Sequence, residues 1–194
     1  MIDRKLLATS ALVYAKGFAS SGLCESTGHN DGIQIDKFEK VWGLGHESWC
    51  SMFLYWCYAK AYCDIAEIAY TADNAVDVFT SIKSHLCGTY VPFSPSCGSM
   101  VDGAKLQGIW HDFKKPSDAS LIKPGHLVIY DWNKTGSPPR RHIGLFDRVD
   151  GAGFLDVEGN TSAGGSGSQD NGDGVYLKHR ASDPGTIMGW VATY

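Results

Sequence analysis

The order of helix-like and strand-like segments predicts an α+β fold, with N-terminal helices packed on an antiparallel sheet of five to six strands. Residues from about 4 to 69 have mostly helical spacing of apolar side chains. Residues from about 123 onward fall into short β-rich runs separated by Gly, Pro, Ser and Asn. A chain of 194 residues suits one domain with a full core, so we expect a single domain over 1–194.

The first twenty residues are expected to form an amphipathic helix. Leu7, Ala11, Ala15 and Phe18 recur near helical spacing. The alternative is a secretory signal, because a basic start precedes a short apolar run and small residues. Polar residues within that run, and Lys16 after it, favour the helix. We therefore expect synthesis in the cytoplasm without a clear signal peptide.

The stretch HESWCSMFLYWCYAKA, residues 46–61, is expected to be a helix that begins at Trp49 with Ser48 as its N-cap. Cys50 would then lie in the first turn, where the helix dipole and free backbone N–H groups favour a thiolate. The alternative is that Cys50 is a small core residue, as we expect for Cys57 two turns later.

The middle segment, about 70–122, is expected to open with a helix over 72–86 and to become irregular over 87–103. The six cysteines of the chain include no CxxC pair, so no zinc cluster is expected. Most should be buried free thiols. Cys87 and Cys97 flank a loop-like stretch, which makes them the candidate pair for a disulfide.

Five β-rich runs in the last third of the chain are expected to form the sheet. The runs cover residues 126–132, 142–149, 154–160, 174–180 and 187–194. The turn at 150–153 should pair the second run with the third as antiparallel neighbours.

Polar side chains on this predicted strand pair include a histidine and a carboxylate. His142 shares a strand face with Gly144, which leaves space beside the imidazole. If His142 lies opposite Asn160, Glu158 is its diagonal neighbour and could fix the tautomer of the imidazole. The alternative is a solvated polar face, because a slip of one residue would move one strand's side chains to the other side.

Several segments together resemble the cysteine, histidine-dependent amidohydrolase/peptidase (CHAP) domains. The nucleophile helix of that family resembles ESWCSMFLYWCYAKA, and its first core strand resembles KPGHLVIYDW. The histidine strand and the segment after it resemble RRHIGLFDRVDGAGFLDVEGNTS, and the closing strands resemble NGDGVYLKHR. Upstream, GLCESTGHNDG is similar to the entry segment of many phage and bacterial members. The resemblance covers most of the chain outside the middle segment.

The resemblance implies a papain-like fold and cleavage of an amide bond in peptidoglycan. It makes Cys50 the nucleophile, His142 the base and Glu158 the orienting partner, with Asn160 as a fourth polar group of the site. Two features depart from the family pattern. His126 replaces an aspartate at the start of the first core strand, and the middle segment is enlarged.

The expected partner is bacterial peptidoglycan, at the cell wall or in the periplasm. A phage lysin and a toxin with delivery machinery and an immunity protein both fit the resemblance. A non-catalytic wall-binding module, and amide or acyl-transfer chemistry on a protein substrate, remain alternatives. A net charge of −4 and a pI near 5.9 argue against nucleic acid and anionic membranes as partners.

No cofactor and no metal are expected. Calcium is the alternative for two polar loops, GHNDGIQID and QDNGDG. The first has Asn30, Asp31 and Asp36 but no dense alternation of carboxylates. The second would begin a calcium loop at Gln169 and place Arg180 where a glutamate is needed, so we expect a glycine turn there.

Overall fold

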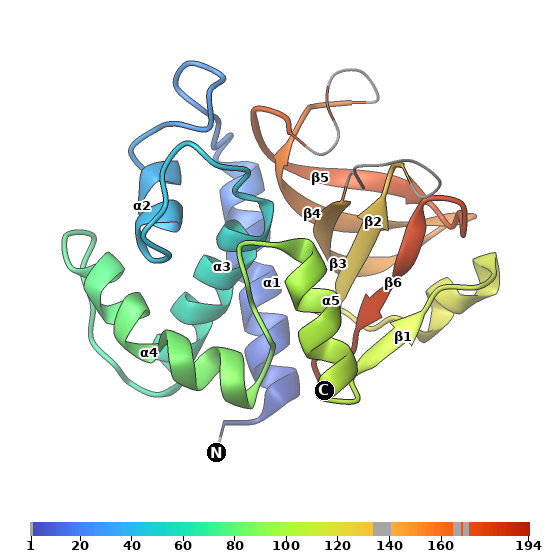
Figure 1. Cartoon of the computed structure of the whole chain (residues 1–194), viewed down its shortest axis with the longest axis horizontal. Helices are drawn as coiled ribbons and strands as arrows, with labels where there is room; N and C mark the ends of the chain where they lie inside the picture. The colour runs from blue at the N-terminus through green and yellow to red at the C-terminus, as the bar shows by residue number, and fades with distance from the viewer. Residues whose placement is uncertain (1, 134–140, 165–167, 169–170) are drawn as a thin grey trace.

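The computed structural model describes residues 2–133, 141–164, 168 and 171–194, and it confirms the predicted α+β arrangement. In Figure 1, the first four α-helices gather on one side of the molecule and the sheet lies on the other. The helical elements are α1 (Arg4–Ser20), α2 (Ile35–Lys40), α3 (Cys50–Ile65), α4 (Ala75–Thr89), α5 (Cys97–Leu106) and the 3-10 helix η1 (Pro116–Leu121).

The sheet is antiparallel and has six strands in the order β1-β6-β2-β3-β4-β5. Its strands are β1 (Trp110–Asp112), β2 (Leu127–Asp131), β3 (Arg141–Asp150), β4 (Gly153–Thr161), β5 (Gly174–Ala181) and β6 (Ile187–Val191). The five β-rich runs of the sequence correspond to β2 through β6. The short strand β1 extends the sheet beyond them, at its edge beside β6.

Helix α1 confirms the expected N-terminal helix. Asp3 caps it by accepting a hydrogen bond from the Leu6 backbone N–H at 2.7 Å. One side of the helix buries Leu7, Ala11 and Ala15 in the main core. This apolar stripe faces α3, against which α1 packs along its length (Figure 1).

Helix α3 runs through the centre of the protein, and most of its residues are buried regardless of the face they occupy. Strand β4 approaches the first turn of α3 closely at Gly159. A Cβ at this position would lie 2.7 Å from the Phe53 ring and 2.8 Å from the Trp49 ring. Glycine therefore lets β4 and the start of α3 lie side by side, which brings the polar residues of β4 toward Cys50.

The sheet buries side chains on both faces. Leu127 and Ile129 of β2 belong to the main core between the sheet and the helices. Val128 and Tyr130 point the other way, into a second core that includes Phe146 of β3. Side chains alternate between the two faces of a strand, and His142 lies four residues before Phe146. His142, at the beginning of β3, therefore lies on the face of the second core.

Two expectations about helices need correction. Residues 87–103 were expected to be irregular, but α5 begins at Cys97. Ser96 caps α5, because its hydroxyl accepts a hydrogen bond from the Ser99 backbone N–H. Trp49, and not Ser48, is the N-cap of α3, so Cys50 is the first residue within that helix.

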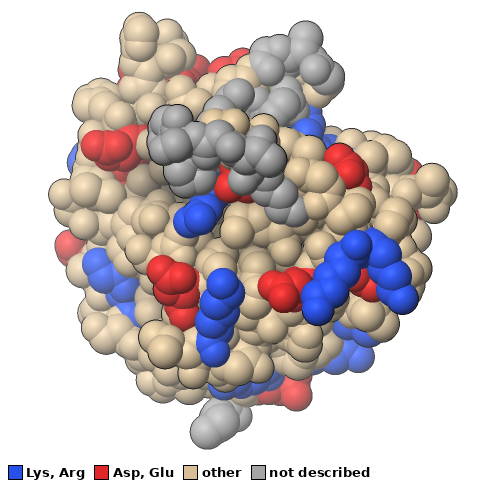
Figure 2. Space-filling model, turned by 45° about the vertical axis from the view of Figure 1, so that its right-hand side comes forward, with Lys and Arg blue, Asp and Glu red and all other residues tan. Residues whose placement is uncertain are grey.

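Charged side chains of both signs are interspersed on the face drawn in Figure 2. In the part of the chain that the structure describes, no helix combines the length and the apolar composition needed to cross a bilayer.

Candidate active site

Cys50 opens helix α3 and is almost completely buried, with 3% of its surface exposed. Its backbone N–H is one of the first-turn donors that have no acceptor within the helix. The loop before it is held by Glu25, whose carboxylate accepts hydrogen bonds from the Trp49 indole at 2.8 Å and from the Asn30 backbone N–H at 3.0 Å. These bonds give Glu25 a structural role and fix the side chain of the residue that precedes Cys50.

His142 and Glu158 reach the same face of the sheet because of a β-bulge. At the hairpin Asp150 pairs with Gly153, but beyond the bulge Phe146 pairs with Asp156, which leaves Asp147 as an extra residue in β3. Continuing the second register by four residues places His142 across from Asn160, as the sequence analysis assumed. Without the bulge, the hairpin register would place Glu158 on the opposite face from His142.

His142 is fully buried and its two ring nitrogens have different surroundings. Nε2 lies 3.0 Å from Oε2 of Glu158, and because an ionised carboxylate only accepts, Nε2–H donates this bond. The interaction of the imidazole with Cys50 therefore falls to Nδ1, which has no other hydrogen-bond partner among the described residues. This is the order that a thiol, an imidazole and an orienting carboxylate need.

The pKa shifts of these groups favour a thiolate and an imidazolium. A hydrogen bond from the Cys97 thiol, joined by the hydrogen bond and charge of His142, outweighs burial and brings the pKa of Cys50 well below its ordinary value. Burial lowers the pKa of His142, but the hydrogen bonds and charges of Cys50 and Glu158 outweigh it and raise that pKa to about 10. Both shifts favour the ionised thiol and the protonated imidazole over the neutral pair.

Arg180 of β5, which was not predicted from the sequence, completes this chain of charges. Its Nε lies 2.6 Å from Oε1 of Glu158 and its Nη2 lies 2.5 Å from Oε2, which is a two-pronged contact. Burial raises the pKa of Glu158, but the hydrogen bonds of His142 and Arg180 outweigh it and lower the pKa to about 2. The guanidinium also lies over the rings of Trp132 and Tyr130.

A second buried carboxyl group, Asp156, lies beside Glu158 on β4. The Tyr130 hydroxyl donates a hydrogen bond of 2.5 Å to it. Burial, followed by the charge of Glu158, raises the pKa of Asp156 well above its ordinary value, which favours the protonated form of this group. The space that Gly144 leaves is filled by the carboxyl group of Asp156 and the side chain of Glu158.

Asn160 lies at the end of this polar row but binds a different partner. Its amide donates a hydrogen bond of 3.4 Å to the side-chain oxygen of Asn171, and the Ser48 hydroxyl donates to that same oxygen at 3.3 Å. Asn160 has a backbone φ of 58°, in the left-handed region that asparagine tolerates, where the pairing of β4 with β5 is irregular. It therefore connects β4 to the segment before Cys50 and makes no hydrogen bond to His142.

Cys97 is the second group that the sequence analysis did not place in the site. Its sulfur lies 3.8 Å from the sulfur of Cys50, and both cysteines are buried. All six cysteines are free thiols, so the expected disulfide between Cys87 and Cys97 is wrong. The signal for Cys97 was present, because Ser96 precedes it as a capping residue and puts a second cysteine at a helix start.

The candidate calcium loop near the N-terminus is organised by its own backbone. The side-chain oxygens of Asp31 accept hydrogen bonds from the backbone N–H and the hydroxyl of Thr27, and Asp36 accepts one from the Gly32 backbone N–H. Within the described residues, no group of three or more His, Cys, Asp or Glu side chains is arranged to hold a metal ion. Gln169 of the other candidate loop lies outside the described residues.

His126, which replaces the aspartate of the family pattern, is a buried structural histidine. Its Nδ1 accepts a hydrogen bond of 3.2 Å from the Lys123 backbone N–H, and burial lowers its pKa to about 4. The neutral imidazole therefore accepts a backbone hydrogen bond and holds the loop at the start of β2 in place.

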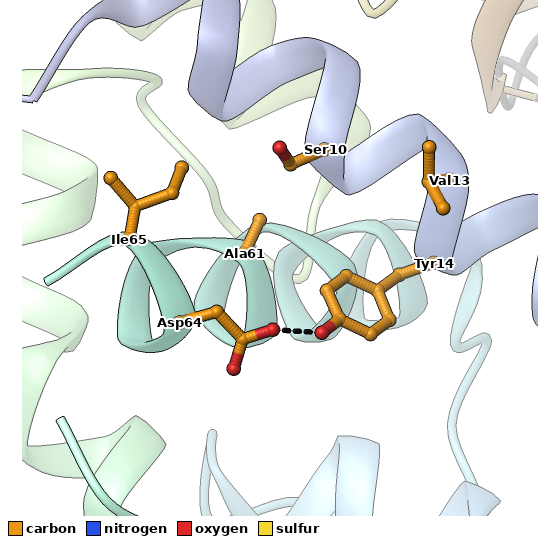
Figure 3. Close-up of a pocket in the computed structure, with 6 residues that line it drawn as sticks. All are labelled: Ser10, Val13, Tyr14, Ala61, Asp64 and Ile65. Carbon is orange, nitrogen blue, oxygen red and sulfur yellow. Dashed lines mark hydrogen bonds between the residues drawn. The ribbon is translucent and has the colours of Figure 1, made fainter. Parts of the chain in front are cut away.

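A separate surface hollow lies between α1 and α3 (Figure 3). In it the Tyr14 hydroxyl donates a hydrogen bond to the Asp64 carboxylate, and both groups are at the surface. The hollow contains no thiol and no imidazole, so we do not place chemistry there. It is lined by Ser10, Val13, Tyr14, Ala61, Asp64 and Ile65.

Comparison with protein-family models, with curated proteins and with solved structures finds no match to this chain. The geometry of Cys50, His142, Glu158 and Arg180 is therefore the direct basis for assigning chemistry. That geometry supplies a cysteine whose pKa is lowered, an imidazole that acts on it, and a carboxylate held by both His142 and Arg180.

Proposed function

We propose that this protein is a cysteine amidase or endopeptidase that cleaves an amide bond of peptidoglycan through a thioester intermediate. The observation that carries the proposal is the convergence of Cys50, His142 and Glu158, which come from α3, β3 and β4. These residues are far apart in the sequence, and a shared structural role would not require a nucleophile, a base and an orienting group in this order.

The reaction begins with the ion pair of the Cys50 thiolate and the His142 imidazolium. The thiolate attacks the carbonyl carbon of the scissile amide, and the carbonyl oxygen gains negative charge. The Cys50 backbone N–H at the start of α3 is placed to donate a hydrogen bond to that oxygen, with the helix dipole adding to the stabilisation.

Collapse of this intermediate requires a proton on the leaving amine. His142 Nδ1 delivers it, and the amine departs while Cys50 keeps the acyl group as a thioester. His142 is then neutral and takes a proton from a water molecule that attacks the thioester. Glu158 holds Nε2 throughout, so the imidazole keeps one orientation as it gains and loses its proton.

The resemblance to CHAP domains supports peptidoglycan as the substrate, and it supports the papain-like description of the fold. On this proposal the protein acts at the cell wall or in the periplasm, as a phage lysin or as an antibacterial toxin. A toxin would also need delivery machinery and an immunity protein as partners. The residues that carry the resemblance include Cys50, His142 and Glu158. The hydrogen bond between His142 and Glu158 and the effect of Cys50 on the pKa of His142 support the proposal.

A polymer substrate requires access to a thiol that is only 3% exposed. Cys97 contributes to this cover, because its sulfur is in contact with that of Cys50. The reaction therefore requires the surface around the start of α5 to move aside when substrate binds, and a small thiol reagent should reach Cys50 more easily than a bulky one.

The decisive experiment compares wild type with Cys50→Ala and Cys57→Ala on purified peptidoglycan. Cys57 is a matched control, because it lies in the same helix, is buried, and has a pKa raised by burial. Mass spectrometry of the released fragments should show one type of cleaved amide bond with wild type and Cys57→Ala. Cys50→Ala should release nothing while its circular dichroism spectrum stays unchanged.

Full lytic activity in a folded Cys50→Ala variant would refute the proposal. The alternatives give different results. A protein substrate is indicated if small alkylating reagents modify Cys50 much faster than Cys57 but no peptidoglycan fragment appears. A non-catalytic wall-binding module is indicated if Cys50 reacts no faster than Cys57 while the protein still binds the wall.

A further inference from the structure

Cys50 and Cys97 form a pair of thiols, of which the proposed hydrolysis uses only one as a nucleophile. Each cysteine is the first residue of a helix, α3 for Cys50 and α5 for Cys97, and their sulfur atoms are 3.8 Å apart. Hydrolysis of an amide through a thioester uses one sulfur atom. The second sulfur lowers the pKa of Cys50 through its hydrogen bond, but it forms no covalent bond in that reaction.

Further contacts hold the start of α3 next to the start of α5. The Ser51 hydroxyl donates a hydrogen bond of 2.6 Å to the Ser94 carbonyl, three residues before Cys97. The same hydroxyl lies 2.9 Å from the sulfur of Met100, one turn into α5. These contacts hold the cysteines as neighbours, so a bond between them closes a contact that already exists.

The electrostatics assign different roles to the two sulfurs. Cys50 carries the thiolate, and the Cys97 thiol donates a hydrogen bond to it, which lowers the pKa of Cys50 and raises the pKa of Cys97. A thiolate is the form that reacts with peroxides, whereas a neighbouring thiol can resolve the oxidised product.

We propose that Cys50 and Cys97 form a peroxide-responsive dithiol site, in which a reversible disulfide between them protects and silences the nucleophile. The chemistry has two steps. The Cys50 thiolate attacks one oxygen of hydrogen peroxide, a sulfur–oxygen bond forms, the oxygen–oxygen bond breaks, and hydroxide leaves and is protonated to water. Cys50, now a sulfenic acid, is oxidised by two electrons and the peroxide is reduced.

In the second step the Cys97 sulfur attacks the sulfur of the Cys50 sulfenic acid. A sulfur–sulfur bond forms, the sulfur–oxygen bond breaks, and hydroxide leaves with the Cys97 proton as a second water. The sulfur atoms must approach from 3.8 Å to about 2 Å, which needs only side-chain rotation and a small shift of the helix starts. A dithiol reductant regenerates both thiols of the protein and is itself oxidised to a disulfide.

Burial makes three of the other cysteines less reactive toward peroxide than Cys50. Cys57 and Cys63 lie further along α3, and burial raises the pKa of each. Burial also raises the pKa of Cys87, to about 11. Among the six cysteines, all of which the structure describes, Cys50 and Cys97 are the pair whose sulfurs are recorded in contact.

The test uses the full chain, equimolar hydrogen peroxide, and peptide mass spectrometry without reduction. Wild type should yield one cross-linked peptide pair that joins Cys50 to Cys97, lighter than the two thiol peptides by the mass of two hydrogen atoms. Cys97→Ser should instead accumulate a sulfenic acid at Cys50 that dimedone traps, and excess peroxide should convert it to the sulfinic acid. Cys87→Ser is the matched control and should cross-link as wild type does.

The effect on function rests on the proposed hydrolase activity, whereas the cross-link does not. Wild type should lose wall lysis with peroxide and regain it with dithiothreitol, while Cys97→Ser should lose its remaining activity permanently. A persistent dimedone adduct on wild-type Cys50, or a cross-link between Cys87 and Cys97, would overturn the dithiol site. A correct cross-link in a protein that never lyses peptidoglycan would overturn the proposed function alone.

Discussion

Replacing Glu158 by Gln removes the charge of the orienting carboxylate but keeps the shape of the side chain. The rise in the pKa of His142 from 6.5 to about 10 corresponds to about 5 kcal/mol in favour of the imidazolium. Cys50 and Glu158 each contribute one hydrogen bond and one charge interaction to that rise. Since Gln can still accept a hydrogen bond but has no charge, we expect the pKa of His142 to fall by about two pH units in Glu158→Gln.

Nuclear magnetic resonance of protein labelled in its histidine side chains measures this pKa directly. The His142 signal is assigned by its disappearance in His142→Gln. Glu47→Gln serves as the matched control, because Glu47 is exposed and lies close to Cys50 in the sequence. An unchanged titration midpoint for His142 in Glu158→Gln would refute the ion-pair description of the site.

The same substitution should also expose the role of Arg180. Glu158→Gln leaves a largely buried guanidinium without its carboxylate, and breaking a buried pair costs about 3–5 kcal/mol of unfolding free energy. The double variant Glu158→Gln/Arg180→Gln removes both charges, so we expect it to be more stable than the sum of the single effects implies. Additive losses in urea unfolding would show that the two side chains are not coupled.

Three further changes test other parts of the structure. Gly159→Ala should lower the unfolding free energy by about 1–3 kcal/mol because its Cβ meets the Phe53 and Trp49 rings, and an unchanged urea midpoint would contradict that packing. Tyr130→Phe leaves Asp156 without its hydroxyl donor and should cost about 1–3 kcal/mol, which chemical denaturation would show. His126 has a folded pKa of about 4 against an ordinary 6.5, so its contribution, about 3 kcal/mol, is present above pH 6.5 and lost as the pH falls toward 4. His126→Gln should remove this part of the acid sensitivity, and an identical pH profile of the melting temperature would refute it.

The sheet was predictable because its strands carry dense β-forming sequence between clear turns. The register that unites His142 with Glu158 was not, since it depends on the bulge at Asp147. A bulge adds one residue to a strand. Here the side chain of that residue, Asp147, forms an ion pair with Lys16 of α1, with 3.0 Å between Oδ1 and Nζ. Nothing in the residues of β3 alone announces a partner that lies 131 positions earlier in the chain.

Helix α5 and its cysteine were missed for a different reason. The run that contains Cys97 has three glycines or serines in its first turns and follows two prolines, which is a composition typical of loops. The helix forms because Ser96 caps it and because Met100 and Val101 are buried against the core. Tertiary packing therefore outweighs weak helix propensity in this segment.

Arg180 was missed although its strand was predicted correctly. The alternation along β5 puts Lys178 and Arg180 on one face, but it does not tell which neighbouring carboxylate a long side chain will reach. Arg180 lies opposite Phe154 in the register and extends along the sheet to Glu158. Reach of this kind depends on side-chain length and on what fills the space between, here the rings of Tyr130 and Trp132.

The surroundings of His142 argue against a purely structural histidine. An unsatisfied ring nitrogen alone does not separate the two roles, because the structural His126 also has one, its Nε2. In His142, Nε2 is bound by a carboxylate that Arg180 keeps charged, while Nδ1 makes no hydrogen bond of standard geometry within the described residues. The Cys50 thiol acts on the imidazole and raises the pKa of His142. What distinguishes His142 is that a charged carboxylate holds Nε2 while the Cys50 thiol acts on the same imidazole, and a nucleophile–base pair explains this combination.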